Sequence, residues 1–173
     1  MFATMLALTV PSVAAVAEGN PSEYDVKAAF LYNFAKFVEW PPNAFDATAG
    51  VIVLAVLGDD PFGPALDRIA DQQLVQGRKI IVKRVARLEE LGVCHVLFLR
   101  LAGEVSLVRF IKNASAAGRL LVGDSEQFAE RGGAIGFFLE QRRVRFIVNL
   151  AAAERAGLKV SSKLLAVAKV IRN

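Results

Sequence analysis

The sequence predicts a single α/β domain in which helices flank a mostly parallel central sheet and an antiparallel hairpin follows near the C-terminus. Short, continuously apolar runs at Val51–Leu57 and Cys94–Leu99 are typical of strands buried on both faces. Segments with helical spacing separate such runs, and this alternation is the pattern of layered α/β folds. The chain has 173 residues and no repeat, which suits one domain with a sizeable core.

The remaining elements follow in a regular order along the chain. Pro61–Asp71 is predicted to be a helix, Arg78–Val85 a second strand, and Leu88–Leu91 a short turn or helix. The same patterns then predict a helix at Glu104–Ala117, a strand at Arg119–Val122, a capped turn of helix at Ser125–Arg131, a hairpin of Ile135–Glu140 with Val144–Asn149 across residues 141–143, and a last helix at Ser162–Ile171 capped by Ser161.

The first helix is expected to begin after Ser22, because Ser22-Glu23-Tyr24-Asp25 resembles a capping box. Pro41 disfavours helical backbone at Trp40, so the helix should end near Trp40. Its apolar side chains form one wide stripe that we expect to face the core: Val26, Phe30, Leu31, Phe34, Phe37 and Val38. Replacement of Phe30 by Ala would cost about 3–5 kcal/mol if that ring is fully buried.

The N-terminus carries an uncharged apolar segment, residues 1–17 (MFATMLALTVPSVAAVA). Ala15-Val16-Ala17 fits the small-x-small pattern that signal peptidase cuts. We interpret residues 1–17 as a secretory signal peptide, residues 18–23 as a short flexible N-terminus and residues 24–173 as the domain. No Lys or Arg precedes the run, which a start codon placed too far downstream would explain. A disordered or core N-terminus is the alternative, and Pro11 argues against a spanning anchor.

Charge and cysteine content narrow the classes of partner. The net charge is +4, and in an exported protein a basic surface favours an acidic protein or anionic lipid over nucleic acid. No basic run alternates with aromatic residues as a nucleic-acid groove needs. Cys94 is the only cysteine, so no internal disulfide can form; we expect a buried thiol, with an intermolecular bridge as the alternative.

Residues that support catalysis are scarce in the sequence. His95 is the only histidine, and one His with one Cys cannot make a structural zinc site. No nucleophile elbow and no phosphate-binding glycine loop is present. We therefore predict no catalytic residues, no metal site and no cofactor, and we interpret His95 as a packed strand residue.

Three aspartates form a candidate ligand pocket. Asp59 and Asp60 follow the first strand, where α/β folds often place ligands, and Asp124 follows the strand ending in LLVG. The three would line one small-molecule cleft if those strand ends are neighbours. The alternative is that each caps a turn or helix. Arg142, Arg143 and Arg145 are interpreted as hairpin-loop charges, with an anion site as the alternative.

Several motifs in fixed order carry a resemblance to a known family. They are KAAFLYNFAKFVEWP, GDDPFG, GRKIIVKRV, CHVLFL, LLVGDSEQFAERGGAIGFFLE and VRFIVNLAAAERAGLKVSSKLL. This series resembles the YfiR-like family of exported bacterial proteins over about residues 24–171. The resemblance implies a periplasmic, non-enzymatic regulator that represses an inner-membrane diguanylate cyclase through its periplasmic part and so lowers cyclic di-GMP and biofilm formation.

The resemblance also implies an outer-membrane lipoprotein that sequesters the regulator, and a homodimer. One departure is that the namesake's cysteine pairs are missing here, so control through an internal disulfide cannot operate. A periplasmic small-molecule-binding module that feeds a membrane receptor is the second hypothesis, and an unrecognised hydrolase is the third. Tyr and Trp are frequent interface anchors, so we hypothesise that Tyr32, Lys36 and Trp40 form part of a contact surface for a partner or a second copy.

Overall fold

The computed structural model describes residues 21–100, 110–111, 114 and 118–173. Within them a twisted sheet of eight strands has the order β10-β8-β7-β6-β5-β2-β4-β3. Its strands are β2 (Ile52–Gly58), β3 (Leu74–Val75), β4 (Arg78–Val85), β5 (Val96–Arg100), β6 (Leu120–Gly123), β7 (Ile135–Glu140), β8 (Arg143–Asn149) and β10 (Lys169–Ile171). Five of the seven neighbouring pairs are parallel, and the β7–β8 hairpin is antiparallel. The predicted fold class is therefore confirmed.

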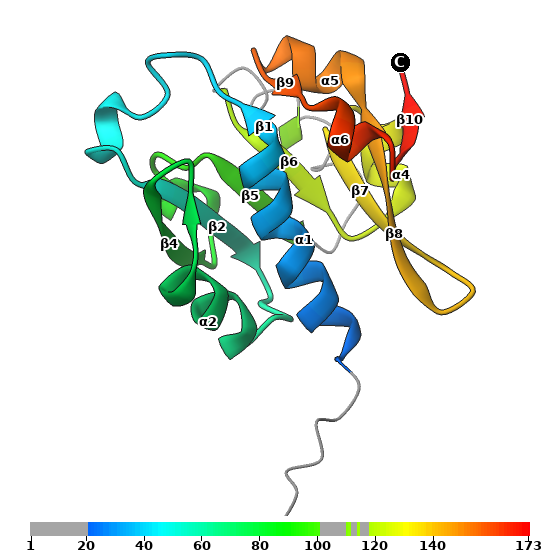
Figure 1. The fold of residues 1–173 in the computed structure, drawn as a ribbon, viewed down its shortest axis with the longest axis horizontal. Coiled ribbons are helices and arrows are strands. Elements are labelled where there is room, and N and C mark those ends of the chain that lie inside the picture. The colour runs from blue at the N-terminus through cyan, green and yellow to red at the C-terminus, as the bar shows by residue number, and fades with distance from the viewer. Residues whose placement is uncertain (1–20, 101–109, 112–113, 115–117) are drawn as a thin grey trace, which may run out of the picture.

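Helices and a small second sheet complete the architecture (Figure 1). The strands β1 (Val38–Glu39) and β9 (Lys159–Val160) pair with each other in antiparallel fashion. The helices are α1 (Glu23–Phe37), α2 (Pro64–Gln72), α4 (Glu126–Glu130), α5 (Leu150–Arg155) and α6 (Ser162–Leu165), with 3-10 turns at Asp46–Thr48 and Leu88–Glu90. The helix predicted at Glu104–Ala117 falls almost entirely outside the described residues.

Two hydrophobic layers enclose the sheet. On one face, α1 and α2 cover alternate residues of the central strands, with Phe34, Phe98 and Phe137 fully buried. On the other face, Phe128 of α4 packs among Leu97, Leu99 and Leu121. A Cβ added at Gly123 would lie 2.1 Å from the Phe128 ring, so the glycine permits this close packing.

The capping box predicted at the start of α1 is confirmed, but the buried face of the helix differs from the prediction. The Ser22 hydroxyl accepts a hydrogen bond from the Asp25 amide at 3.2 Å, and the Asp25 carboxylate accepts one from the Ser22 amide. Leu31, Phe34 and Val38 are buried as predicted, and the half-buried Phe30 and Phe37 pack against the core, whereas Val26 is half-buried at the margin of the helix. The prediction missed Lys27, Ala28 and Ala35, which are also buried.

The structure also corrects three predicted boundaries. Helix α1 ends at Phe37 rather than near Trp40, because Val38 and Glu39 become extended and pair with β9. Helix α2 begins at Pro64 rather than Pro61, since a hydrogen bond from the Phe62 amide to Asp60 holds a turn before it. The loop of the β7–β8 hairpin is only two residues long.

The prediction of a last helix at Ser162–Ile171 is mostly wrong. Ser161 does cap α6, since its hydroxyl accepts from the Lys163 amide. The helix ends at Leu165, however, and Lys169–Ile171 forms β10, which pairs in parallel with Ile147–Asn149 of β8. The backbone groups of β10 form hydrogen bonds with β8. Helical spacing within the segment cannot predict this pairing, because it depends on a distant strand.

Candidate functional site

A buried charge lies where α1 meets the carboxyl end of β6. Lys27 is only 3% exposed, and its Nζ donates to Asp124 Oδ1 at 2.6 Å and to the carboxylate of Glu23. The Tyr24 hydroxyl donates to the other oxygen of Asp124 at 2.8 Å. Burial alone lowers the pKa of the Lys27 ammonium, but the bonds to Asp124 and Glu23 outweigh it, so the pKa is raised and the charge is kept.

Tyr24 occupies the edge of the sheet between the ends of β2 and β5. After β2 the chain crosses to β4 on one side of β2, and after β4 it returns to β5 on the other side of β2. The position between the carboxyl ends of β2 and β5 is therefore the topological switch point, where open α/β sheets commonly bind ligands. The Tyr24 ring packs edge-on against Phe62 with centroids 5.6 Å apart, and the Arg100 guanidinium lies 5.7 Å from the ring centroid. The first turns of α1 therefore fill this position with protein side chains.

The three aspartates of the predicted pocket have different surroundings. Asp60 caps the Phe62 amide and accepts from Arg84 Nε at 2.5 Å, while Asp59 is exposed. Strand β5 lies between β2 and β6, so the strand ends that carry Asp59 and Asp124 are not adjacent. Neither of the two surface hollows described below is lined by these aspartates. A ligand bound by all three stays a prediction.

The residues of the predicted contact surface lie on and just beyond α1. Tyr32 is half-buried, and its hydroxyl lies 3.4 Å from the carbonyl oxygen of Leu74. Lys36 is exposed, with its Nζ 6.0 Å from the centroid of the Tyr32 ring. Trp40 is half-buried against Phe45, with ring centroids 6.2 Å apart. Tyr32 and Lys36 thus form one continuous surface, whereas Trp40 belongs to the loop after β1.

His95 is buried directly before β5 and is held by backbone groups on both sides of its ring. Its Nδ1 accepts a hydrogen bond from the Val53 amide at 2.9 Å, so the ring is neutral and its Nε2 donates to the Ala44 carbonyl at 3.0 Å. Burial lowers its pKa, the Ala44 bond raises it, and nearby Arg78 lowers it; the net direction is down. With both nitrogens engaged, this ring packs as predicted and offers no free base.

Cys94 lies beside His95 and is buried, as predicted. Burial raises the pKa of its thiol to about 11, and Arg119 and Lys83 oppose that shift only in part. A thiol with this pKa stays protonated at neutral pH and is a poor nucleophile.

Two surface hollows border the β7–β8 hairpin, and the sequence did not indicate them. One has a volume of about 550 Å³ and lies between α1 and the hairpin; the other, of about 640 Å³, lies between the hairpin and the α6–β10 connection. Leu139 lines both and is 54% exposed. The only sequence signal is that Leu139 precedes a run of charged and polar residues at the hairpin tip.

These features define an α/β domain with an occupied switch point and an exposed apolar hairpin. The family described as YfiR/HmsC-like matches residues 24–169, and the chain therefore belongs to that family. No curated protein matches the chain. Among the described residues, no group of His, Cys, Asp and Glu side chains could hold a metal ion. No helix in that part of the chain is long and apolar enough to cross a bilayer.

Solved structures show the same fold at low sequence identity. A conserved domain protein from Vibrio cholerae O1 biovar El Tor superposes with a TM-score of 0.57 at 12% identity, covering 86% of this chain and 60% of its own. An ABC domain in complex with L-Trp from Streptococcus pneumoniae superposes with a TM-score of 0.50 at 10% identity, covering 72% of this chain and 56% of its own. The chain thus spans less than two thirds of either protein, and at these identities the likeness shows the fold alone.

Proposed function

We propose that this protein is a periplasmic, non-enzymatic regulator that binds the periplasmic part of an inner-membrane diguanylate cyclase and represses it, lowering cyclic di-GMP. The observation that carries the proposal is membership of the YfiR/HmsC-like family over residues 24–169. The +4 net charge and the exposed apolar hairpin add support, because both suit a protein partner.

The mechanism is stoichiometric binding rather than turnover. Docking biases the cyclase toward an inactive state by no more than the difference in affinity for its two states. An outer-membrane lipoprotein that competes for this protein would relieve the repression, and a homodimer is part of the same proposal. Because Cys94 is the only cysteine, no internal disulfide contributes to regulation.

Export requires that residues 1–17 act as a signal peptide, leaving residues 18–23 as a short N-terminus before the family domain at residues 24–173. Periplasmic extract of the native host should contain a chain whose first residue is Glu18, as read by N-terminal sequencing. A chain that keeps its N-terminal segment and stays in the cytoplasm would contradict this part of the proposal.

The regulatory role is tested by deleting the gene in the native host and measuring cyclic di-GMP. We expect the level to rise several-fold and to return when the full chain is supplied. A version lacking residues 1–17 is the matched control and should not restore it. Deletion of the cyclase as well should remove the rise. An unchanged cyclic di-GMP level in the single deletion would overturn the proposal.

Tyr32, Lys36 and Trp40 are proposed to contribute to the contact surface. The ammonium of Lys36 is exposed, and the half-buried rings of Tyr32 and Trp40 leave aromatic edges available to a partner, although the Trp40 Nε1 itself is buried. Replacing all three by Ala should weaken binding to the cyclase's periplasmic part about tenfold in a solution assay. Unchanged binding together with unchanged stability would remove these residues from the surface.

A small-molecule-binding module is the second candidate function, with Asp59, Asp60 and Asp124 as its pocket residues. It is favoured by the place of Asp59 and Asp60 directly after the carboxyl end of β2, beside the switch point that Tyr24 fills. Because the similar domain from Streptococcus pneumoniae is described in complex with L-Trp, L-tryptophan is a natural first probe. A rise in melting temperature with L-tryptophan that Asp60→Asn abolishes would support this module, and no rise with any amino acid would count against it.

A further inference from the structure

The β7–β8 hairpin leaves the sheet as an arm, which we define as residues Phe138–Arg145. Strand β10 pairs only with Ile147–Asn149 of β8, so no strand of the described chain covers the outer side of β8 beside the arm. Figure 1 shows the loop of the hairpin extending away from the rest of the molecule. Three cross-strand pairs, from Phe138↔Arg145 to Glu140↔Arg143, hold the arm together.

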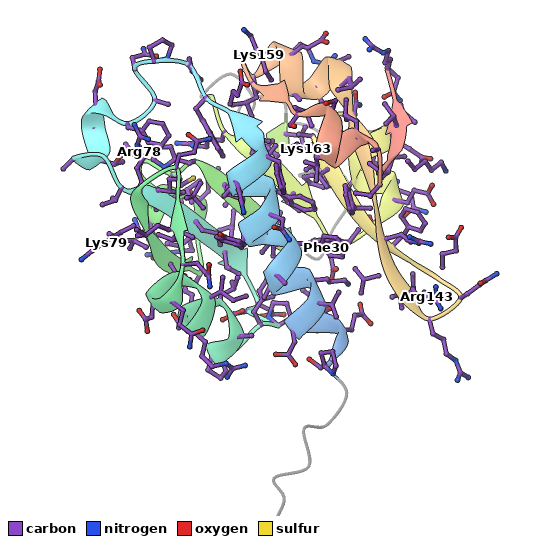
Figure 2. The ribbon with its side chains drawn as sticks, in the orientation of Figure 1. Phe30, Arg78, Lys79, Arg143, Lys159 and Lys163 are labelled. Atoms are coloured by element: carbon purple, nitrogen blue, oxygen red, sulfur yellow. The ribbon has the colours of Figure 1, made fainter. Side chains whose placement is uncertain are left out.

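Apolar surface lies on both sides of this arm. The groove on the α1 side is lined by Pro21, Val26 and Phe30 from the N-terminal segment and by Leu139 and Val144 from the arm. Glu23 also lines it, but this carboxylate is paired with Lys27. The half-buried Phe30 ring rests on the Phe146 ring, with centroids 5.2 Å apart, and so joins this groove to the core. Figure 2 shows Phe30 and Arg143 on the two sides of the groove.

The groove on the other side is mixed in character. Its apolar residues are Phe138, Leu139, Phe146 and Val167, which is 62% exposed, and charged side chains line the rest: Glu126, Glu140, Arg145 and Lys169. Leu139 lines both grooves, so a ligand or partner that contacts both grooves at once must extend across the arm. A small molecule is too short to do so, whereas a protein surface is not.

The tip of the arm is basic. Arg145 pairs with Glu140 at 3.4 Å, but within the described residues the structure shows no ion pair for Arg142 or Arg143. Both side chains are exposed and border the α1-side groove. Two arginines on the arm side of an apolar groove are complementary to a partner whose apolar residues are flanked by Asp or Glu.

The backbone of the tip places Arg142 in a conformation that does not favour turn stability. Gln141 and Arg142 both have positive φ, 49° and 63°, as a two-residue hairpin loop with the twist of the strands requires. Asn-Gly adopts this conformation readily, whereas other side chains adopt it at a cost in stability. Strain of this kind is common where a side chain serves binding.

We propose that the arm is a docking element for an acidic, apolar surface of a protein partner, with Leu139 as the apolar anchor and Arg142 and Arg143 as the charged rim. The inference deepens the proposed function by locating the surface that would engage the cyclase. A second copy of this chain is a poor occupant, because a two-fold contact at the tip would set arginine against arginine.

The test is photo-crosslinking of the tagged full chain in its native host. A photo-crosslinking amino acid is placed at position 139 or, as the matched control, at position 88, because Leu88 is 46% exposed beyond the carboxyl end of β4, and β2, β5 and β6 separate β4 from the hairpin. We expect position 139 to give an adduct with a different protein and position 88 to give at least tenfold less. Arg142→Glu with Arg143→Glu should lower the adduct about tenfold.

A second pair of variants controls for charge alone. Lys159→Glu with Lys163→Glu makes the same change at exposed positions away from the arm, as Figure 2 shows, and should leave the adduct within twofold. No adduct at position 139, equal adducts at both positions, an adduct of the chain with itself, or equal effects of the two charge reversals would each overturn the docking role of the arm.

The outcomes separate this inference from the proposed function. Mass spectrometry that identifies a diguanylate cyclase in the adduct supports both. An adduct with another protein that depends on Arg142 and Arg143 supports the arm and contradicts the cyclase as its target. Absence of the adduct in a strain where the chain still lowers cyclic di-GMP contradicts the arm and leaves the function standing.

Discussion

The Nζ atom of Lys27 in α1 lies 2.6 Å from Oδ1 of Asp124, a residue 97 positions later in the chain that directly follows β6. Tyr24, one turn earlier on the same helix, donates to the second oxygen of that carboxylate. The pair fastens the start of α1 over the carboxyl edge of the sheet. Because the ammonium is almost fully buried, loss of the Asp124 carboxylate would leave Glu23 as its one remaining anionic partner among the described residues.

Asp124→Asn should therefore destabilise the fold by about 3 kcal/mol, since removing one partner of a buried ion pair leaves a buried charge uncompensated. The measurement is urea unfolding followed by circular dichroism, with the variant and the parent chain compared at equal m-value. Asp59→Asn is the control, because Asp59 is exposed, and its effect should stay within about 0.5 kcal/mol. A loss below 1 kcal/mol for Asp124→Asn would show that Glu23 alone suffices to hold Lys27.

Phe34 and Phe30 offer a matched pair on α1. The Phe34 ring is fully buried between Phe137 and Phe146, so Phe34→Ala should cost about 3–5 kcal/mol. Phe30 is half-buried at the edge of a groove, so Phe30→Ala should cost about 1–2 kcal/mol, in proportion to the smaller area that it buries. Denaturant unfolding of the two variants gives the comparison. Equal losses would mean that the Phe30 side of the helix is core after all.

Much of the central sheet could be predicted from sequence because its strands are buried on both faces. Ile52–Gly58 and Val96–Arg100 are continuous apolar runs, and glycines or polar residues mark their ends. The hairpin was equally visible, since two apolar runs flank a polar turn. Contacts between distant segments leave no signal in the local sequence. From its own segment Lys27 is expected at the surface, and its burial follows from the ion pair with Asp124. Lys169–Ile171 has helical spacing, but it forms a strand because it pairs with β8.

The candidate surfaces were harder to predict for a related reason. The helical stripe that contains Phe30 follows from spacing alone, whereas the burial of Lys27 depends on its ion pair with Asp124. Leu139 alternates correctly for a strand residue, yet it is 54% exposed, because β6 pairs with β7 only as far as Gly136 and leaves the arm without a neighbouring strand on that side. Sequence patterns report burial averaged over an element, whereas a docking surface arises where an element extends past its neighbours.

His95 makes the stability of the fold depend on pH in a predictable direction. Its pKa in the folded chain lies below the ordinary value of 6.5, so the unfolded chain binds the proton more tightly. The stability from the neutral ring is fully present above pH 6.5 and is lost as pH falls through 6.5 toward the folded pKa, with a slope of at most about 1.4 kcal/mol per pH unit.

Urea unfolding at intervals between pH 7.5 and 5 measures this slope. No other histidine contributes, because His95 is the only one in the chain. The lowered pKa values of the Asp25 and Asp67 carboxyls, caused chiefly by hydrogen bonds to Ser22 and Arg84, act only below their ordinary value of 3.8. If the free energy of unfolding did not change between pH 7 and 5, the folded chain would protonate His95 as readily as the unfolded chain does, even though its Nδ1 faces the Val53 amide.

A double substitution in the turn at the tip of the arm can distinguish an effect on stability from an effect on binding. Gln141→Asn with Arg142→Gly places Asn-Gly at the two positions of positive φ, which should stabilise the fold by about 1–2 kcal/mol because both residues then accept this backbone at little cost. The measurement is the urea midpoint at equal m-value. The same variant should give less crosslinking from position 139, because one guanidinium of the rim is gone. A chain that is more stable and yet binds less well assigns Arg142 to recognition, whereas a destabilised chain assigns it to the fold.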